Sequence, residues 1–131
     1  YLSRSLYIVS MSQKKPALLL VENDPLSLML YDRELNPYYS IVPCKSEVEA
    51  RVALESKKIS LIILEPANGN DWVWGFLKQI KAIEDMVNIP VIFCSVLDEK
   101  KKALQQGASA YLIKPVDANV LRQHVQEFLE K

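Results

Sequence analysis

The chain of 131 residues has few of the residues around which phosphate loops, zinc sites and hydrolase sites are built. Its three glycines form neither G-x-G-x-x-G nor G-x-x-x-x-G-K followed by Ser or Thr, so no nucleotide-binding loop is indicated. Cys44 and Cys94 match neither a C-x-x-C redox motif nor a zinc spacing, and we expect both to be buried reduced thiols. The single histidine, His124, has no partner at a recognisable spacing, which excludes a familiar hydrolase motif.

The chain also lacks a long hydrophobic run and a net charge. No apolar run approaches the roughly 20 residues that cross a bilayer. Residues 1–10 have neither the long apolar region nor the small-residue cleavage site of a signal peptide. Sixteen basic and sixteen acidic residues cancel, which disfavours nucleic acid and membranes as partners of this domain. Together with the reduced cysteines, these features predict a cytoplasmic location.

The composition predicts a compact globular unit, because 50% of the residues are hydrophobic and 24% are charged. The length suits one domain that buries most of the apolar surface of a single core. Met11 lies ahead of the polar stretch that precedes the first apolar run. We therefore expect residues 1–13 to be an N-terminal extension or upstream segment and residues 14–131 to form the domain.

Five short apolar runs predict buried strands, because runs that are apolar throughout fit strands covered on both faces of a sheet. Helical patterns separate them, and the strict alternation predicts an α/β fold with a doubly wound parallel sheet of five strands. The predicted strands are residues 17–21, 39–44 (an edge strand), 61–64, 90–94 and 110–113, and the predicted helices are about 24–36, 46–55, 72–84, 98–106 and 117–130.

Each longer predicted helix carries an apolar stripe that we expect to face the sheet. Asp24 and Asp117 are expected to be N-caps, Ser46 a third cap, and Gly107 the glycine that ends the short helix before the last strand. The expected inward residues are Leu26, Met29, Leu30 and Leu35; Val48, Val52 and Leu54; Val73, Phe76, Leu77 and Ile80; and Val120, Leu121, Val125, Phe128 and Leu129.

Polar side chains follow four of the predicted strands at the point where each strand ends. They are Glu22 with Asn23, Glu65, Ser95 and Lys114. In an open parallel sheet, ligands bind just beyond the carboxyl ends of the strands. The sequence therefore predicts one site to which these side chains all contribute.

Four segments resemble the receiver domain of bacterial two-component response regulators, and the resemblance covers about residues 14–128. They are LVENDP (20–25), LIILE (61–65), PVIFCS (90–95) and GASAYLIKP (107–115). The resemblance implies a flavodoxin-like, CheY-like sheet with strand order 2-1-3-4-5. It also implies an acidic pair that holds magnesium, an aspartate that accepts a phosphoryl group, a hydroxyl side chain and a lysine.

Carried onto this sequence, the family pattern assigns a role to six residues. They are Glu22 and Asn23 at the acidic pair, Glu65 at the phosphoacceptor, Ser95 at the switch hydroxyl, Lys114 at the lysine and Tyr111 at the switch aromatic. Magnesium would be held through Glu22 and Glu65, and no other cofactor is implied.

Asn23 and Glu65 depart from the family pattern. Asn23 puts a neutral amide where magnesium prefers a carboxylate, so we expect magnesium binding to be weak or absent. Glu65 has one more methylene than aspartate, which displaces its oxygens by about one carbon–carbon bond in a reaction that depends on alignment. We expect the longer carboxylate to reach Lys114 and to accept a hydrogen bond from Ser95, imitating part of a phosphorylated aspartate.

These departures predict a pseudo-receiver in phosphorelay signal transduction that is not an enzyme and acts by protein–protein interaction. The resemblance implies a histidine kinase or output domain as partner, or a homodimer, through the fourth helix, fifth strand and fifth helix (residues 98–128). Two alternatives stay open. One is a working phosphorelay receiver that uses Glu65, Asp24 or Asp71 as acceptor, and the other is a flavodoxin-type small-molecule binder.

Overall fold

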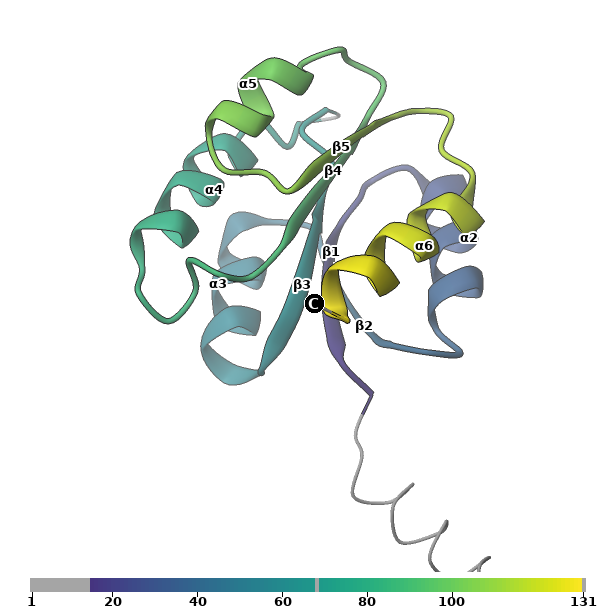
Figure 1. Cartoon of the computed structure of the whole chain (residues 1–131), viewed down its shortest axis with the longest axis horizontal. Helices are drawn as coiled ribbons and strands as arrows, with labels where there is room; N and C mark the ends of the chain where they lie inside the picture. Colours follow the sequence, from purple (N-terminus) through teal and green to yellow (C-terminus); the bar gives the residue numbers. More distant parts are fainter. Residues whose placement is uncertain (1–14, 68, 131) are drawn as a thin grey trace, which may run out of the picture.

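The computed structural model describes residues 15–67 and 69–130, which form a chain of alternating strands and helices (Figure 1). The predicted extension, residues 1–13, lies outside the described residues. In chain order the elements are β1 (Ala17–Val21), α2 (Pro25–Leu35), β2 (Ser40–Cys44), α3 (Glu47–Ser56), β3 (Ile59–Leu64), α4 (Val73–Ala82), β4 (Val91–Ser95), α5 (Lys100–Gln105), β5 (Ala110–Ile113) and α6 (Ala118–Leu129).

The five strands form one parallel sheet in the order β2-β1-β3-β4-β5, so the predicted fold class and strand order are confirmed. β2 lies at an edge, as its sequence predicted. The register pairs Val21 with Leu64 and Ser95 with Ile113, which aligns the carboxyl ends of the strands along one side of the sheet. None of the helices in the described parts of the chain is long and apolar enough to cross a membrane.

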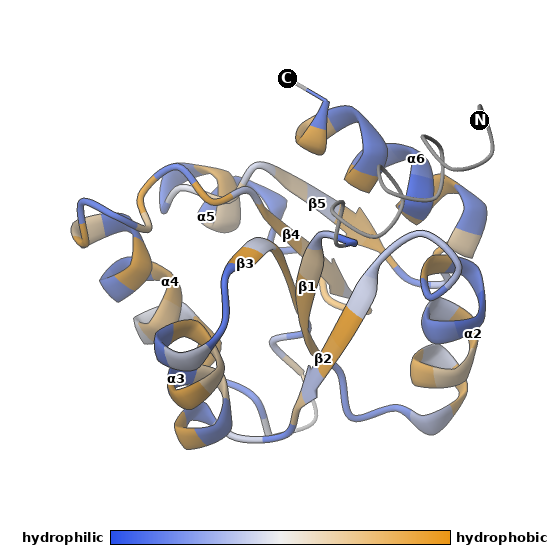
Figure 2. Ribbon diagram, turned by 90° about the horizontal axis from the view of Figure 1, so that it is seen from below, coloured by the Kyte–Doolittle hydropathy of each residue, from blue (hydrophilic) through white to orange (hydrophobic). Residues whose placement is uncertain are grey.

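Helices cover both faces of the sheet, with α3, α4 and α5 on one face and α2 and α6 on the other (Figures 1 and 2). Successive strand residues point to opposite faces. In β1, Leu19 and Val21 join the core under α3 and α4, while Leu18 and Leu20 join the core under α2 and α6. Two buried layers explain why the strand sequences are apolar throughout.

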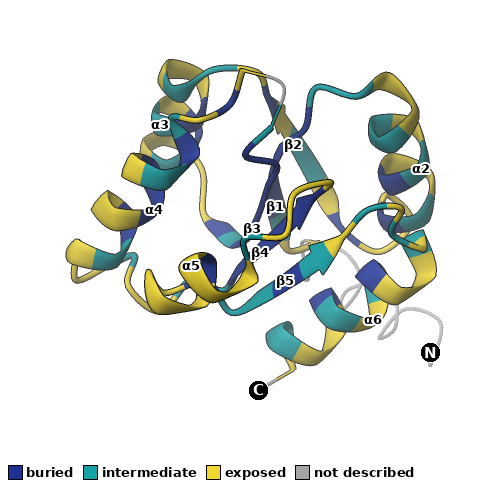
Figure 3. Ribbon diagram, turned by 90° about the horizontal axis from the view of Figure 1, so that it is seen from above, coloured by how far each residue is buried: buried dark blue, intermediate teal, exposed yellow. Residues whose placement is uncertain are grey.

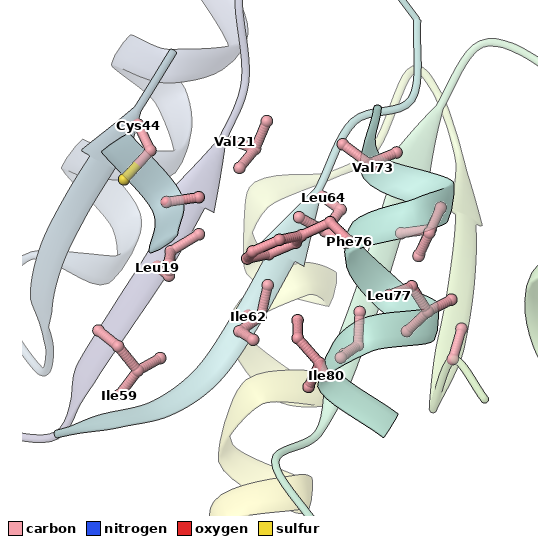
Figure 4. Packing of buried hydrophobic residues seen from close by; sticks show 14 of the residues in the cluster. Leu19, Val21, Cys44, Ile59, Ile62, Leu64, Val73, Phe76, Leu77 and Ile80 are labelled. Carbon is pink, nitrogen blue, oxygen red and sulfur yellow. The ribbon is translucent and has the colours of Figure 1, made fainter. Parts of the chain in front are cut away.

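The apolar stripe of α4 faces the sheet as predicted. Figure 4 shows its side chains packed over β1 and β3, and all four are at most 2% exposed. They are Val73, Phe76, Leu77 and Ile80. In α6 the predicted stripe is largely correct, since Leu121 and Val125 are buried, but Val120 is 39% exposed.

The predicted inward stripes of α2 and α3 are only partly correct. Leu35 is buried, and Leu30 and Leu54 pack against the core, but the other predicted residues are exposed. Leu26 and Met29 are 59% and 56% exposed, and Val48 and Val52 are 71% and 56% exposed. The buried residues that the sequence did not predict are Tyr31 in α2, and Ala50 and Ala53 in α3. The inner face of α3 thus carries small side chains, and its larger valines are exposed. Figure 3 shows α3 with exposed residues along its outer side.

The predicted helix caps are confirmed. Asp24 accepts a hydrogen bond from the Ser27 backbone N–H at 3.0 Å, Ser46 from Glu49 at 3.2 Å and Asp117 from Asn119 at 2.8 Å. Each side chain satisfies a donor that the first turn of a helix leaves free. Gly107 follows α5 with φ of 106°, as expected for a helix-ending glycine.

Candidate functional site

The carboxyl ends of β1, β3, β4 and β5 bring the predicted polar residues together. Glu22 directly follows β1, Glu65 follows β3, Ser95 is the last residue of β4 and Lys114 follows β5. Glu22 and Glu65 are each 1% exposed, and the Lys114 side chain is 10% exposed. Because these strands are neighbours in the sheet, three charged side chains meet in a small buried volume.

Lys114 connects the two carboxylates. Its Nζ atom lies 2.7 Å from Glu22 Oε1 and 3.0 Å from Glu65 Oε2. Among the described residues, these two oxygens have no other hydrogen-bond donor. Glu22 Oε2 accepts from the Asp24 N–H at 3.1 Å, and Glu65 Oε1 accepts from the Ala67 N–H at 2.9 Å. All four carboxylate oxygens therefore have a partner within the chain.

Burial and ion pairing act against each other at this cluster. Burial raises the pKa of Glu22, although hydrogen bonds from Lys114 and Asp24 act in the opposite direction. Burial alone would lower the pKa of Lys114, but its hydrogen bonds to Glu22 and Glu65 and their charges raise it above the usual value. The ammonium thus stays charged and offsets part of the negative charge buried around it.

Ser95 does not bond to Glu65, and this part of the sequence-based expectation is wrong. Ser95 is fully buried, and its Oγ accepts a hydrogen bond from the Leu97 N–H at 3.1 Å. Its carbonyl oxygen accepts from the Lys114 N–H at 2.8 Å. The Glu65 carboxylate bonds to the Ala67 N–H and pairs with Lys114 instead. Through its bond to the Leu97 N–H, Ser95 holds the loop after β4.

Tyr111 fixes the same loop from β5. Its side chain is turned inward, with 6% exposed, and stacks on Phe93 with ring centroids 5.9 Å apart. Its hydroxyl donates a hydrogen bond to the Leu97 carbonyl and accepts one from the Glu99 N–H at 3.3 Å. The loop between β4 and α5 is therefore held at both ends, by Ser95 and by Tyr111.

Asn70 belongs to the site, although the sequence did not predict it. It lies in the loop between β3 and α4, is 1% exposed, and accepts a hydrogen bond from Asn23 Nδ2 at 3.1 Å. This bond ties the loop after β3 to the start of α2. In sequence, Asn70 is one of several turn residues in the loop, and no motif separates it from its neighbours.

Asp24 and Asp71, the alternative acceptors expected from the sequence, do not take part in these ion pairs. Asp24 caps α2, and its Oδ2 accepts from the Ser27 hydroxyl at 2.7 Å as well as from the Ser27 N–H. Hydrogen bonds from the Ser27 side chain and backbone lower the pKa of Asp24. Asp71 is exposed in the loop before α4.

The residues present do not fit a magnesium ion. Magnesium binds proteins through one or two carboxylate oxygens, with waters completing a near-ideal octahedron. Here Lys114 and backbone N–H groups engage every oxygen of Glu22 and Glu65. Within residues 15–67 and 69–130, no group of three or more His, Cys, Asp or Glu side chains could hold a metal ion.

The family model that describes the response regulator receiver domain matches residues 18–126. The transcriptional regulatory protein GlrR of Escherichia coli is 30% identical over 125 residues, which cover 92% of this chain and 28% of GlrR. CitT of Halalkalibacterium halodurans, also a transcriptional regulatory protein, is 25% identical over 122 residues, which cover 86% of this chain and 52% of CitT. The chain thus spans only part of the length of these relatives.

Solved structures share the fold. A two-component response regulator from Clostridium difficile has a TM-score of 0.78 and 24% identity, covering 89% of this chain and 98% of that chain. The receiver domain of the sensor histidine kinase PA1611 from Pseudomonas aeruginosa was solved with magnesium in its active site cleft. It has a TM-score of 0.77 and 20% identity, and the match covers 90% of this chain and 100% of that chain. With the sheet order, the strand-end site and the family match over most of its length, this chain belongs to the response regulator receiver domains of two-component signalling.

Proposed function

We propose that this receiver domain is a pseudo-receiver, in which Glu65 stands at the phosphoacceptor position and the domain signals by binding other proteins. The observation that carries the proposal is the contact of Lys114 Nζ with Glu22 Oε1 and Glu65 Oε2, at 2.7 and 3.0 Å. Phosphoryl transfer normally relies on metal ions to neutralise charge around the transferred group. In this chain an internal ammonium lies between the two carboxylates.

The burial and the partners of Glu65 also argue against transfer of a phosphoryl group to it. An attacking oxygen must be accessible and in line with the phosphoryl donor. Glu65 is 1% exposed, its Oε1 accepts from the Ala67 N–H, and its Oε2 pairs with Lys114. Attack would require the ion pair to break and the loop after β3 to move. The chain therefore holds Glu65 as a structural partner of Lys114.

The ion pair supports a single conformation of the strand ends. It joins β5, through Lys114, to β1 and β3, through Glu22 and Glu65. A carboxylate carries one negative charge, whereas a phosphoryl group carries about 1.5 to 2, so Glu65 imitates a phosphorylated aspartate only in part. A change of state would then come from a partner that binds one conformer more tightly than another.

The contact surface in this proposal is formed by α5, β5 and α6. It exposes apolar side chains from each element, since Leu104, Ile113 and Val120 are 41%, 49% and 39% exposed. The partner is a histidine kinase, an output domain or a second copy of the chain. The matched relatives are transcriptional regulatory proteins that extend beyond the matched region, and an output domain in the same polypeptide suits this surface.

The second candidate is a working phosphorelay receiver. It is favoured by Ser95 and Lys114, which stand at the family's hydroxyl and lysine positions, and by the exposed carboxylate of Asp71 in the loop that follows Glu65. The two candidates differ in one property, which is whether the chain gains a phosphoryl group from a small donor in the presence of magnesium.

Intact-protein mass spectrometry after incubation with acetyl phosphate and magnesium measures that property. We expect no phosphoryl adduct on the wild-type chain or on Glu65→Gln. We expect a phosphoryl adduct on the double variant Asn23→Asp, Glu65→Asp, because it restores the second acid and the shorter acceptor. The single variant Glu65→Asp separates the effect of the acceptor from that of Asn23.

An adduct on the wild-type chain would overturn the pseudo-receiver proposal. If Glu65→Gln removes that adduct, Glu65 is the acceptor. If the adduct persists in Glu65→Gln but disappears in Asp71→Asn, the acceptor is Asp71. In either case the chain is a working phosphorelay receiver.

A further inference from the structure

An open groove lies where β1, β2 and β3 begin, at the end of the sheet opposite the candidate site. Its volume is about 870 Å³, and small-molecule sites in proteins occupy about 300 to 1,000 Å³. The strands are parallel, so their amino ends meet at this end of the sheet and their carboxyl ends at the other. In Figure 1, β1 enters the sheet at its lower end. The groove is therefore a second concave surface, remote from Glu65.

The groove is lined by lysines and by no acid among the described residues. Lys15 comes from the segment before β1, and Lys57 and Lys58 form the connection between α3 and β3. Within the described chain, none of the three forms an ion pair with a carboxylate. Glu55, the acid closest in sequence, lines a separate groove between α3 and α4. Positive charge is thus concentrated here, in a chain whose net charge is zero.

The register of the sheet brings these lysines together. β1 and β3 are neighbouring strands, and Ala17 pairs with Ile59. Lys15 and Lys57 each lie two residues before this pair, and Lys58 lies one residue before it. Neighbouring strands are about 4.8 Å apart. The three lysines therefore lie at one end of two adjacent strands, which suits one compact ligand with several charges.

The remaining lining adds hydroxyl groups and a small apolar wall. Ser40 and Ser60 belong to the first turns of chain in β2 and β3, and Pro16 and Val42 are apolar. Lys15 Nζ donates one of its three N–H bonds to the Asn36 carbonyl, at 3.1 Å, which leaves two for a ligand. Lysine binds phosphate as a point charge, and hydroxyl groups donate to phosphate oxygens. A single carboxylate would offset only one of the three positive charges.

We propose that this groove binds a small polyphosphate, an anion of two or more linked phosphate groups, whose oxygens pair with the ammonium groups of Lys15, Lys57 and Lys58. This inference goes beyond the proposed function, because the groove and Glu65 lie at opposite ends of the strands. Binding makes and breaks no covalent bond. It therefore holds or fails independently of whether the chain accepts a phosphoryl group.

Isothermal titration of the 131-residue chain with inorganic pyrophosphate, without magnesium, is the first test. We expect saturable binding of one pyrophosphate per chain. The affinity should fall as potassium chloride is added, because salt screens exposed charges. Sulfate at the same ionic strength is the control for a general effect of anions, and it should bind more weakly because it carries fewer charges than pyrophosphate.

A double variant tests the lysines. Lys57→Gln with Lys58→Gln should raise the dissociation constant about tenfold or more, because two charged contacts are lost. Lys100→Gln with Lys101→Gln is the matched control, since it removes the same charge from two adjacent exposed lysines on α5 and should leave binding unchanged. Lys57→Arg with Lys58→Arg keeps both charges and should retain binding. Circular dichroism checks that each variant keeps its fold.

NMR places the ligand on the chain. Pyrophosphate should shift the amide signals of Ser40, Lys57 and Ser60 and leave that of Ala67, which bonds to Glu65, in place. The reverse pattern overturns the proposal, because the anion would then bind at the carboxyl ends of the strands.

Three further results would also overturn it. One is the absence of saturable pyrophosphate binding with a dissociation constant below about 1 mM. Another is an equal loss of affinity in the control pair on α5, or equal binding of sulfate, since either means a general attraction of anions. The last is a short oligoglutamate peptide that binds more tightly than pyrophosphate and depends on Lys57 and Lys58, which would make the groove a contact for an acidic protein segment.

Discussion

Lys114 has a structural role that its position in the sequence alone did not define. Its ammonium is the only described donor to one oxygen each of Glu22 and Glu65, both of which are buried. A buried ion pair contributes little to stability compared with a well-packed apolar replacement, but removing one partner leaves an uncompensated charge. The stability of the site therefore depends strongly on this single side chain.

Lys114→Met should lower the free energy of unfolding by about 3 kcal/mol, because two buried carboxylates would lose their cation. Urea denaturation at neutral pH measures the loss. Lys101→Met, which removes an exposed lysine from α5, is the matched control and should change stability by less than about 0.5 kcal/mol. Equal stability of Lys114→Met and the wild type would show that the cluster does not need its ammonium.

The raised pKa of Lys114 predicts how stability changes in alkali. A lysine whose pKa is higher in the folded than in the unfolded state adds stability below its unfolded pKa, and that stability is lost as the pH rises through the folded pKa. The usual value is 10.5, so the loss should begin above about that pH. The difference in unfolding free energy between wild type and Lys114→Met should shrink from pH 9 to pH 12. A difference that stays constant over this range would contradict a raised pKa of Lys114 in the folded chain.

At the scale of elements, the loop between β4 and α5 depends on two hydroxyl groups. Tyr111→Phe should make the Glu99 amide exchange with solvent faster and leave the Leu97 amide protected, because Glu99 bonds to Tyr111 and Leu97 bonds to Ser95. Ser95→Ala should give the reverse pattern. Each change should cost about 1 to 2 kcal/mol. Hydrogen exchange followed by NMR measures both amides, and equal protection in all three proteins would mean that neither hydroxyl holds the loop.

Alanine should change stability in opposite directions at two glycines, one within a helix and one that follows a helix. Gly75 lies within α4, and an added Cβ would meet no atom within 4 Å, so Gly75→Ala should stabilise the chain by about 1 kcal/mol. Gly107 has φ of 106°, and its Cβ would lie 3.0 Å from Lys81 Cγ, so Gly107→Ala should destabilise by about 1 kcal/mol or more. Urea midpoints measure both effects, and the same sign for the two variants would contradict this account.

At the scale of the whole molecule, the strands were predictable and the rotation of two helices was not. Strands buried on both faces leave an unambiguous run of apolar residues. In α3, apolar residues lie on two sides, and periodicity alone does not tell whether Val48 and Val52 or Ala50 and Ala53 face the sheet. Packing against β2 and β1 decides it, and β1 is distant from α3 in sequence.

The site was predictable to the extent that strand ends define it. Alignment of the strands was enough to predict that Glu65 would reach Lys114. The bond between Asn23 and Asn70 and the turn of Ser95 toward Leu97 depend on how the loops fold over the strand ends. Loop conformation follows from many weak local contacts and leaves no periodic signal in the sequence.

Two contacts ahead of β1 bear on where the folded domain begins. Ahead of β1, Lys15 Nζ donates to the Asn36 carbonyl at 3.1 Å, and the Pro16 carbonyl accepts from the Ser40 N–H at 2.9 Å. A chain of residues 14–131 keeps both contacts, and the sheet it contains has helices on both faces. Its free energy of unfolding should therefore equal that of the 131-residue chain within about 0.5 kcal/mol.

A chain that begins at Ala17 is the matched control for this truncation. It loses the partner of the Ser40 N–H at the edge of the sheet, and it should be less stable by about 1 kcal/mol. Urea denaturation of the three chains side by side makes the comparison. If the chain that begins at residue 14 is already less stable than the full chain by about 1 kcal/mol, residues 1–13 contribute to the folded domain. The boundary of the domain would then lie nearer the N-terminus.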